Sequence, residues 1–389
     1  MAGIIFKKFL MLKWGMLIGI DGNEANITNR VGVNQFAFHL LWGMYESVKK
    51  SNDQHLEFRI FLAEPPLSDL PPENDWWKYE VFGPKFLWTR IGLVKRLYLG
   101  KPKPDVIFSP SHYGPGVSPI PSIISIMDLG FIHWPEQFTK LIYWQLKHWT
   151  RRSVKQAVRI VTISNFSKKD IVKTYDIPEE KVTVAYLGYN QREEPAHLDE
   201  GLRNKYNLPK KYILYLGTLK PNKNIDGLIR SYELLIKNYE LKDTSLVIAG
   251  KKGWLYEDLF NLVREKGLED RVIFTGFVED EEVQPIMAGA EVFVMPSYWE
   301  GFGIPVLEAM AAETPVVCSD QASLSEVAGE ASLFVDPDEP KDIAEKINRV
   351  LTDDKLRKDL IQSGREQVKK FSWDKCSQKI LKTIINEVN

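Results

Sequence analysis

Short apolar runs recur along the chain, and each is followed by a glycine-rich or polar loop and then by an amphipathic stretch. Runs of four to eight such residues are typical of strands buried on both faces of a parallel sheet, with helices as the connections. The pattern therefore predicts an α/β protein. In chain order the runs are MLIGID (16–21), EFRIFLA (57–63), DVIFS (105–109), PSIISIM (121–127), RIVTIS (159–164), KVTVAY (181–186), YILYLG (212–217), SLVIAG (245–250), RVIFTG (271–276), EVFVM (291–295) and PVVC (315–318).

The length of 389 residues exceeds what one ordinary hydrophobic core covers, so two domains are expected. The polar segment 190–208, QREEPAHLDEGLRNKYNLP, is interpreted as the linker between them. The predicted boundaries are 1–190 for the first domain, 209–371 for the second and 372–389 for a terminal helix.

The most informative stretch is EVFVMPSYWEGFGIPVLEAMAAETPVVCSD, residues 291–320. Gly303 can cap a helix in which Pro305 occupies the first turn, where a missing N–H costs nothing. The free amides and the macrodipole of that helix end favour an anion, typically a phosphate. Glu300 precedes the helix and Glu308 falls about one turn inside it, so the two acids could hold hydroxyls on either side of a diphosphate. Taken singly, Glu300 is more simply explained as a solvated loop acid, and Glu308 as a first-turn acid favoured by the dipole.

The segment PSYWEGFGIPVLEAMAAETPVV resembles the donor-binding motif of the retaining glycosyltransferases of family four. In that family the first glutamate, here Glu300, meets hydroxyls of the transferred sugar. The amides of Phe302, Gly303 and Ile304 would contact the sugar and diphosphate, and Glu308 would hold the ribose. The resemblance extends over nearly the whole chain and is strongest from 212 to 335.

The resemblance implies a GT-B fold, with two Rossmann-like domains facing across a cleft and a C-terminal helix that crosses back to the first domain. It implies metal-independent transfer of a sugar from GDP-mannose or a UDP-sugar, with retained configuration, to an acceptor hydroxyl in glycan, polysaccharide or glycolipid synthesis. The nucleotide sugar is a co-substrate, and no cofactor is expected. The alternatives are a non-catalytic donor-binding subunit, or another GT-B enzyme such as an epimerase or a phosphorylase.

A second strand–loop–helix unit, YILYLGTLKPNKN, spans 212–224. Lys223 stands at the start of its helix, where a cation opposes the dipole and so indicates a bound anion. Thr218 and Asn222 stand where the family commonly has arginine, which leaves a thinner diphosphate clamp. Gly32, ahead of the first helix, suits close approach of a ligand or simply a turn; the family carries a glycine loop there on the donor side.

The loop after the run 121–127 departs from the family pattern. The family usually has a His-Asp pair at this point, close to the reacting centre, whereas this chain has Met127-Asp128. Asp128 matches the second position and is the candidate catalytic residue of the first domain, beside Glu300 in the second. His112 and His133 are the nearby imidazoles, and the sequence does not choose between them.

The charge balance and the cysteine content bear on nucleic-acid binding, metal binding and the redox setting of the protein. Lysine plus arginine number 51 against 52 acidic residues, which argues against a nucleic-acid binder. The two cysteines, Cys318 and Cys376, have no metal-site spacing, so no metal is expected and a reducing, cytoplasmic setting is the natural interpretation.

Two segments raise the question of a membrane. The section 85–99 mixes aromatic, aliphatic and basic residues, which predicts either a surface helix packed on the sheet or peripheral contact with anionic lipid on the inner membrane face. The N-terminal MAGIIFKKFLMLKWGM is interpreted as an amphipathic anchor, or as the product of an upstream start codon with the chain proper beginning near Met11 or Met16. The expected partners are a nucleotide-sugar donor and a glycan or lipid-linked acceptor.

Overall fold

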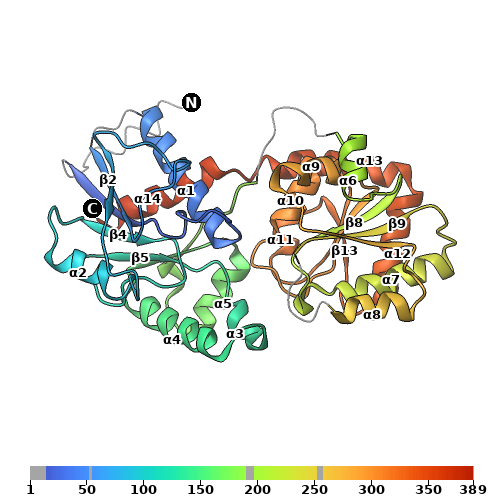
Figure 1. The fold of residues 1–389 in the computed structure, drawn as a ribbon, viewed down its shortest axis with the longest axis horizontal. Helices are drawn as coiled ribbons and strands as arrows, with labels where there is room; N and C mark the ends of the chain where they lie inside the picture. Colours follow the sequence, from blue (N-terminus) through green and yellow to red (C-terminus); the bar gives the residue numbers. More distant parts are fainter. Residues whose placement is uncertain (1–14, 52–54, 190–196, 252–256, 389) are drawn as a thin grey trace. The chain divides into compact units, whose positions relative to one another are not determined.

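The computed structural model describes residues 15–51, 55–189, 197–251 and 257–388. The N-terminal segment 1–14, on which the anchor and start-codon interpretations rest, lies outside this set. The chain divides into two compact units (Figure 1). Unit 1 comprises Met1–Gly188 and Ser372–Asn389, and unit 2 comprises Tyr189–Phe371.

Unit 1 is built on a seven-stranded parallel sheet with the order β3-β2-β1-β4-β5-β6-β7. Its strands are β1 (Met16–Asp21), β2 (Leu56–Leu62), β3 (Trp77–Val81), β4 (Val106–Ser109), β5 (Ser122–Ser125), β6 (Arg159–Thr162) and β7 (Val182–Val184). The apolar runs predicted all of these except β3. As an edge strand, β3 buries only Trp77 of its five residues, so it lacks an apolar run.

The helices of unit 1 include the C-terminal one, as the GT-B fold predicted. Helix α14 packs on α1, with the rings of His39 and Trp373 stacked 4.5 Å apart. Gly43 permits this contact, because a Cβ there would lie 2.4 Å from the Ser377 hydroxyl. The helices are α1 (Val33–Ser51), α2 (Gly92–Leu99), α3 (Gly130–His133), α4 (Lys140–Gln156), α5 (Asn165–Tyr175) and α14 (Trp373–Asn386).

The prediction of one helix over 85–99 is wrong in extent. Helix α2 begins only at Gly92, and Leu87 has φ of +50°, a conformation that a helix interior excludes. The segment 85–91 therefore forms turns, with Trp88 buried and donating a hydrogen bond to the carbonyl of Phe82 at 2.7 Å. The basic and aromatic residues of this section do not share one helix face.

Unit 2 repeats the arrangement with a six-stranded parallel sheet in the order β10-β9-β8-β11-β12-β13. Its strands are β8 (Tyr212–Leu216), β9 (Ser245–Ala249), β10 (Val272–Gly276), β11 (Val292–Met295), β12 (Val316–Ser319) and β13 (Ser332–Val335). Its helices are α6 (Glu200–Lys205), α7 (Ile225–Asn238), α8 (Glu257–Glu265), α9 (Asp280–Ala288), α10 (Ile304–Ala311), α11 (Leu324–Ala328), α12 (Pro340–Thr352) and α13 (Asp354–Val368).

The end of the segment assigned to the linker is folded. Helix α6 lies within it, and Tyr206 and Leu208 beyond the helix are buried. Lys205 and Tyr206 both bond the carboxylate of Glu282 on α9. Polar composition suggested a linker here because a short surface helix needs few apolar residues to hold it.

Candidate functional site

Both sheets reverse their strand order at one point, between β1 and β4 in unit 1 and between β8 and β11 in unit 2. Ligands of open α/β sheets bind outside the carboxyl ends of the strands at this switch point. In unit 2 the two segments that follow those strand ends are 217–224 and 296–303. The two strand–loop–helix units that the sequence predicted as anion sites are thus neighbours at the switch point of one sheet.

Glycines let three loops of unit 2 touch at this edge. The amide of Gly217 donates to the carbonyl of Ala249 at 2.9 Å, and the amide of Gly250 donates to that of Gly276 at 2.8 Å. A Cβ on Gly250 would lie 2.0 Å from the Gly217 carbonyl oxygen, so a side chain there would force the loops apart. The loops after β8, β9 and β10 consequently form one connected rim.

Helix α10 begins as the sequence predicts. Gly303 is its N-cap with φ of +99°, a left-handed conformation that favours glycine, and Pro305 lies in the first turn. A Cβ on Gly303 would come 2.5 Å from Cδ2 of Leu324. Phe302 is buried and packs edge-on against Phe371, with centroids 5.8 Å apart. The loop is therefore fixed at the N-terminus of α10, where the first amides of a helix lack the usual acceptor four residues earlier. Of those in the first turn, Val306 donates to the Gly303 carbonyl at 3.0 Å.

The structure brings together two residues that the sequence had placed in separate motifs. Lys223 Nζ lies 2.6 Å from Glu300 Oε2, and the side chains are only 18% and 12% exposed. The other carboxylate oxygen of Glu300 accepts a hydrogen bond from the Ser297 hydroxyl at 2.9 Å. Beside them lies the buried hydroxyl of Tyr215, which has no hydrogen-bond partner in the described chain. Burial, and then the charge of Glu300, raise the pKa of Tyr215 well above its usual value.

Asparagines hold the two loops against each other, a role that the sequence analysis missed. Asn222 donates to the carbonyl of Trp299 at 3.2 Å, so this residue, at a position where arginine is common in the family, braces the loop. Asn224, buried and left-handed, donates to the carbonyls of Pro296 at 3.1 Å and Pro337 at 2.7 Å. Thr218 is exposed at the rim.

Glu308 is half-buried in the second turn of α10. Burial, and then the negative charge of Asp280 at the start of α9, raise the pKa of Glu308 from 4.5 to about 7. A carboxyl that titrates near neutrality is typical of a functional site. Asp280 carried no signal in the sequence, because it lies at the start of a different helix, α9.

In unit 1, Asp128 follows β5 and its Oδ1 accepts the amide of Gly130 at 2.7 Å, which begins α3. Met127 is buried and 7% exposed. The imidazole that interacts with Asp128 is that of His112, from the loop after the neighbouring strand β4, and the ring bonds the Asp128 backbone. Burial lowers the pKa of His112, and the charge and backbone bond of Asp128 oppose the shift. His133 instead pairs with Asp170 at 3.0 Å.

Two further acids lie at the switch point of unit 1 and were not singled out from the sequence. Glu24 accepts hydrogen bonds from Asn34 at 2.6 Å and from the Ser111 hydroxyl at 3.2 Å. Burial raises the pKa of Glu24, and it raises that of Asp21 to about 7 against the opposing bonds from Asn23. Residues from β1, α1 and the β4 loop thus meet where a hydroxylic ligand could bind.

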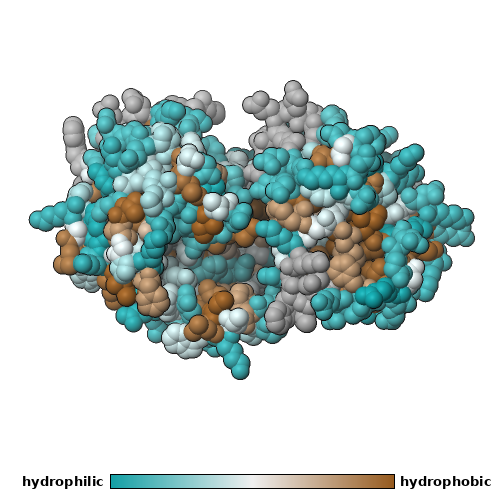
Figure 2. Space-filling model, viewed as in Figure 1, coloured by the Kyte–Doolittle hydropathy of each residue, from teal (hydrophilic) through white to brown (hydrophobic). Residues whose placement is uncertain are grey.

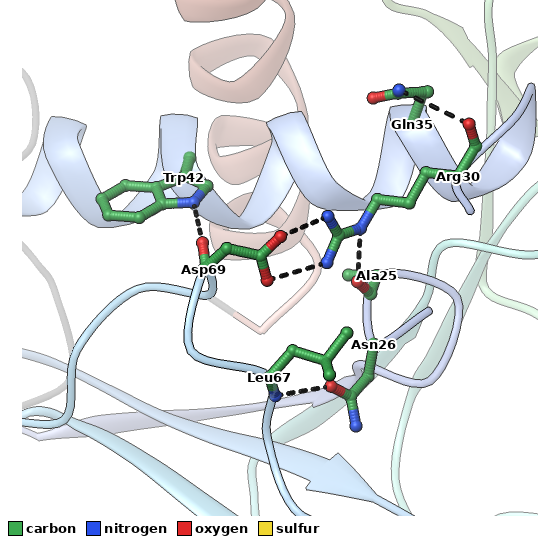
Figure 3. Close-up of polar contacts among 7 residues, drawn as sticks. All are labelled: Ala25, Asn26, Arg30, Gln35, Trp42, Leu67 and Asp69. Atoms are coloured by element: carbon green, nitrogen blue, oxygen red, sulfur yellow. Dashed lines mark hydrogen bonds and ion pairs between the residues drawn. The ribbon is translucent and has the colours of Figure 1, made fainter. Parts of the chain in front are cut away.

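Polar contacts of Arg30 hold the loop that precedes α1 and contains Gly32 (Figure 3). Arg30 forms a two-pronged ion pair with Asp69, at 2.6 and 3.0 Å, and its Nε donates to the carbonyl of Ala25 at 2.8 Å. The Trp42 indole donates to the carbonyl of Asp69 at 2.9 Å. Gly32 itself is exposed at φ of +53°, with no atom within 4 Å of an added Cβ. The left-handed turn accounts for the glycine, and the space beside it is open.

The described residues contain neither a cluster of metal ligands nor a helix that could span a membrane. No group of three or more His, Cys, Asp or Glu is placed there to hold a metal ion. No helix among them has the length and hydropathy to cross a bilayer.

Two parallel α/β sheets of the same strand order, with a C-terminal helix returned to the first unit, define the GT-B class of glycosyltransferase. Solved structures agree in fold. The sucrose-phosphate synthase of Thermosynechococcus elongatus superposes with a TM-score of 0.70 at 18% identity, covering 95% of this chain and 98% of that one. WaaG, a glycosyltransferase involved in lipopolysaccharide biosynthesis, gives 0.66 at 15% identity, with 95% and 99% covered.

Sequence comparison identifies the family. The profile "Glycosyl transferases group 1" matches residues 200–367, and "Glycosyltransferase Family 4" matches 59–193. O-antigen chain mannosyltransferase B of Escherichia coli is 34% identical over 259 residues, 66% of this chain and 68% of the relative. O-antigen chain mannosyltransferase RfbU of Salmonella typhimurium is 28% identical over 257 residues, 66% and 67%. The chain belongs to glycosyltransferase family 4, and the family predicted from residues 291–320 is confirmed.

Proposed function

We propose that this glycosyltransferase moves mannose from GDP-mannose to a hydroxyl of a growing glycan, with retained configuration. The O-antigen mannosyltransferases among its relatives support the choice of sugar. The observation that carries the site is the Lys223–Glu300 pair, 2.6 Å apart at the switch point of unit 2 and next to the N-terminus of α10.

Each group at this edge then has one task. Lys223 and the amides of Phe302, Gly303 and Ile304 bind the diphosphate, and Thr218 at the rim contacts it. Glu300 accepts hydroxyls of the sugar, while Glu308 accepts those of the ribose. When the donor enters, its phosphate competes with Glu300 for Lys223 and leaves the carboxylate available to the sugar.

Bond cleavage leaves a departing diphosphate and an oxocarbenium-like sugar. Stabilising the leaving group is the largest contribution a protein can make to such a step. Lys223 and the dipole of α10 supply positive charge for that purpose, which supports a metal-independent reaction. Both cysteines are buried and free, which supports a reducing, cytoplasmic setting.

In unit 1 we assign Asp128 and His112 together to the reacting centre. The imidazole that the family places one residue before this aspartate is supplied in space by the β4 loop, where His112 bonds the Asp128 backbone. This assignment bears on one of the two features that favour a non-catalytic subunit, the methionine at 127; the other, the thinner diphosphate clamp, is unaffected by it. It also leaves Met127 a buried structural residue.

The proposal is tested by measuring the thermal shift of the protein with a panel of nucleoside diphosphates and nucleotide sugars. A ligand at a hundred times its dissociation constant should add about 2.7 kcal/mol of stability, and GDP and GDP-mannose are expected to lead the panel. Glu308→Ala should weaken GDP binding, Glu300→Ala should mainly slow transfer, and the exposed Glu330→Ala serves as control.

Three results would each reject the assignment. Preference for another base would reject GDP-mannose. Binding of GDP-mannose without release of GDP on adding acceptor would make the chain a donor-binding subunit. Conversion of the donor alone, or phosphate-dependent cleavage of a glycan, would indicate an epimerase or a phosphorylase.

A further inference from the structure

A cavity of about 470 Å³ in unit 1 lies outside the residues assigned so far. It is formed by the turn before α2, the loop after β4 and one face of α4. Its lining residues are Arg90, Pro115, Gly116, Val117, Trp144, His148, Trp149 and Arg152. The lining contains two arginines and no acidic residue.

Arg90 is held in place by two aromatic rings and by a glycine. Its guanidinium carbon lies 4.6 Å from the centre of the Trp149 ring and 5.9 Å from that of Tyr113. It also packs on Gly116, where a Cβ would fall 1.8 Å from Nη1. Its Nε and Nη2 are buried and have no hydrogen-bond partner among the described residues. Buried donors of this kind cost free energy unless an acceptor arrives.

Arg152 adds a second positive charge beside Arg90. Its Nε donates to the carbonyl of Gly116 at 3.1 Å. Within the described parts of the chain neither arginine has a carboxylate within 4.0 Å. Burial, and then repulsion from Arg152, lower the pKa of Arg90 to about 10, so that Arg90 remains charged at neutral pH. Two cations without a counter-charge specify an anion, and planar guanidinium groups match the oxygens of phosphate.

The two sequence segments that contain Arg90 and Arg152 are basic, although Lys85 and Arg96 in them pair with Glu64 and Glu80 from other segments. The segments 81–104 and 138–158 contain eleven lysines and arginines and no acidic residue, in a chain with a net charge of −1. The first contributes Lys85, Arg90, Lys95, Arg96, Lys101 and Lys103, and the second Lys140, Lys147, Arg151, Arg152 and Lys155.

Apolar side chains reach the surface on the same two segments. Trp144, in the cavity wall, is 53% exposed, and Leu141 one turn earlier in α4 is 74% exposed. Phe86 and Ile91 flank Arg90 in sequence and are 75% and 46% exposed. Figure 2 shows brown side chains on the visible surface where α2 lies in Figure 1. An anion pocket with an exposed apolar margin fits a ligand that has a phosphate at one end and hydrocarbon at the other.

We propose that the Arg90–Arg152 cavity binds the phosphate or diphosphate group of a single amphiphilic molecule, with its hydrocarbon chain over Trp144 and Leu141. Resting on the proposed function, this amphiphile is the carrier of the acceptor glycan. The binding itself does not depend on the donor sites of unit 2.

Binding to the intact chain is measured with two soluble probes, inorganic pyrophosphate and geranyl diphosphate. Geranyl diphosphate should bind more tightly than pyrophosphate, because only it covers the apolar margin. Arg152→Ala should weaken it about tenfold to a hundredfold, the size of a lost hydrogen bond to a charged group. Arg151→Ala removes the same charge from the adjacent exposed position of α4, outside the cavity, and should leave binding within about twofold. Arg90→Gln should act like Arg152→Ala.

Several results would overturn the proposal. Equal weakening in Arg151→Ala and Arg152→Ala would assign binding to general positive charge. Equal affinity for pyrophosphate and geranyl diphosphate would show that the hydrocarbon chain adds nothing to binding, and would refute an amphiphilic ligand. Binding to vesicles of phosphatidylglycerol, unchanged by Arg152→Ala and without binding of geranyl diphosphate, would assign the surface to a bilayer instead. GDP-induced stabilisation of each variant, measured in parallel, reports separately on the donor site.

Discussion

Glu308 offers a stability measurement that bears directly on function. Its pKa in the folded chain is raised to about 7 by burial and by Asp280, against a usual value of 4.5. The difference of about 2.5 units corresponds to about 3 kcal/mol at 1.36 kcal/mol per unit. Glu308→Gln removes the ionisation while keeping the shape, so the variant should be more stable than the parent at pH 8 by up to this amount.

The sign follows from linkage between protonation and folding. Below pH 4.5 the carboxyl is protonated in both the folded and the unfolded chain, and the substitution changes little. Between pH 4.5 and about 7 the unfolded chain ionises while the folded chain does not, so the parent loses stability as pH rises. Above about pH 7 both forms are ionised, and the deficit of the parent is constant.

Urea unfolding between pH 4.5 and 8.5, with and without GDP, is the assay. The difference in unfolding free energy between Glu308→Gln and parent should grow across this window and then level off. The same variant should lose most of the stabilisation by GDP, because only the carboxylate accepts both ribose hydroxyls. Glu330→Gln, at an exposed position, should follow the parent throughout. A pH-independent difference would refute the electrostatic reasoning, and full GDP stabilisation of Glu308→Gln would refute the ribose assignment.

Three other outcomes are expected. Gly303→Ala should destabilise the chain by about 1–3 kcal/mol in urea unfolding, because φ is +99° and Leu324 must move; an unchanged midpoint would show that the loop adapts. A double-mutant cycle of Lys223→Ala and Glu300→Ala should give a coupling of about 1–2 kcal/mol in the free chain, and additivity would mean that the pair contributes nothing. His112→Ala should lower turnover about 100-fold while GDP binding is retained; unaltered turnover would remove His112 from the reacting centre.

Local chemistry made the donor loop predictable. The strand at 292–295, the glycine turn and the proline in the first helical turn occur together in sequence, and the structure realises each of them. The same holds for the alternation of apolar runs and helices, which predicted every strand that is buried on both faces. The exceptions are elements with few buried apolar residues: the edge strands β3 and β13, and the surface helix α6.

The prediction of a helix over 85–91 was wrong for a different reason. Spacing of apolar and basic residues is compatible with a helix there, but the left-handed conformation of Leu87 excludes it. Helical spacing in the sequence indicates which residues could share one face of a helix. Whether they do depends on the backbone conformation. The exposed apolar residues of this section consequently border a cavity around Arg90 and do not line one helix face.

Contacts between loops that follow different strands could not be predicted from the sequence. Lys223 and Glu300 are 77 residues apart and meet only because β8 and β11 are neighbours in the sheet. His112 reaches Asp128 in the same way, from β4 to β5, and Asp280 reaches Glu308 from α9 to α10. Under the proposed assignment, the imidazole at the reacting centre comes from the end of the neighbouring strand and not from the motif itself. A residue missing from a motif is therefore evidence of lost activity only after the neighbouring strand ends have been searched for its replacement.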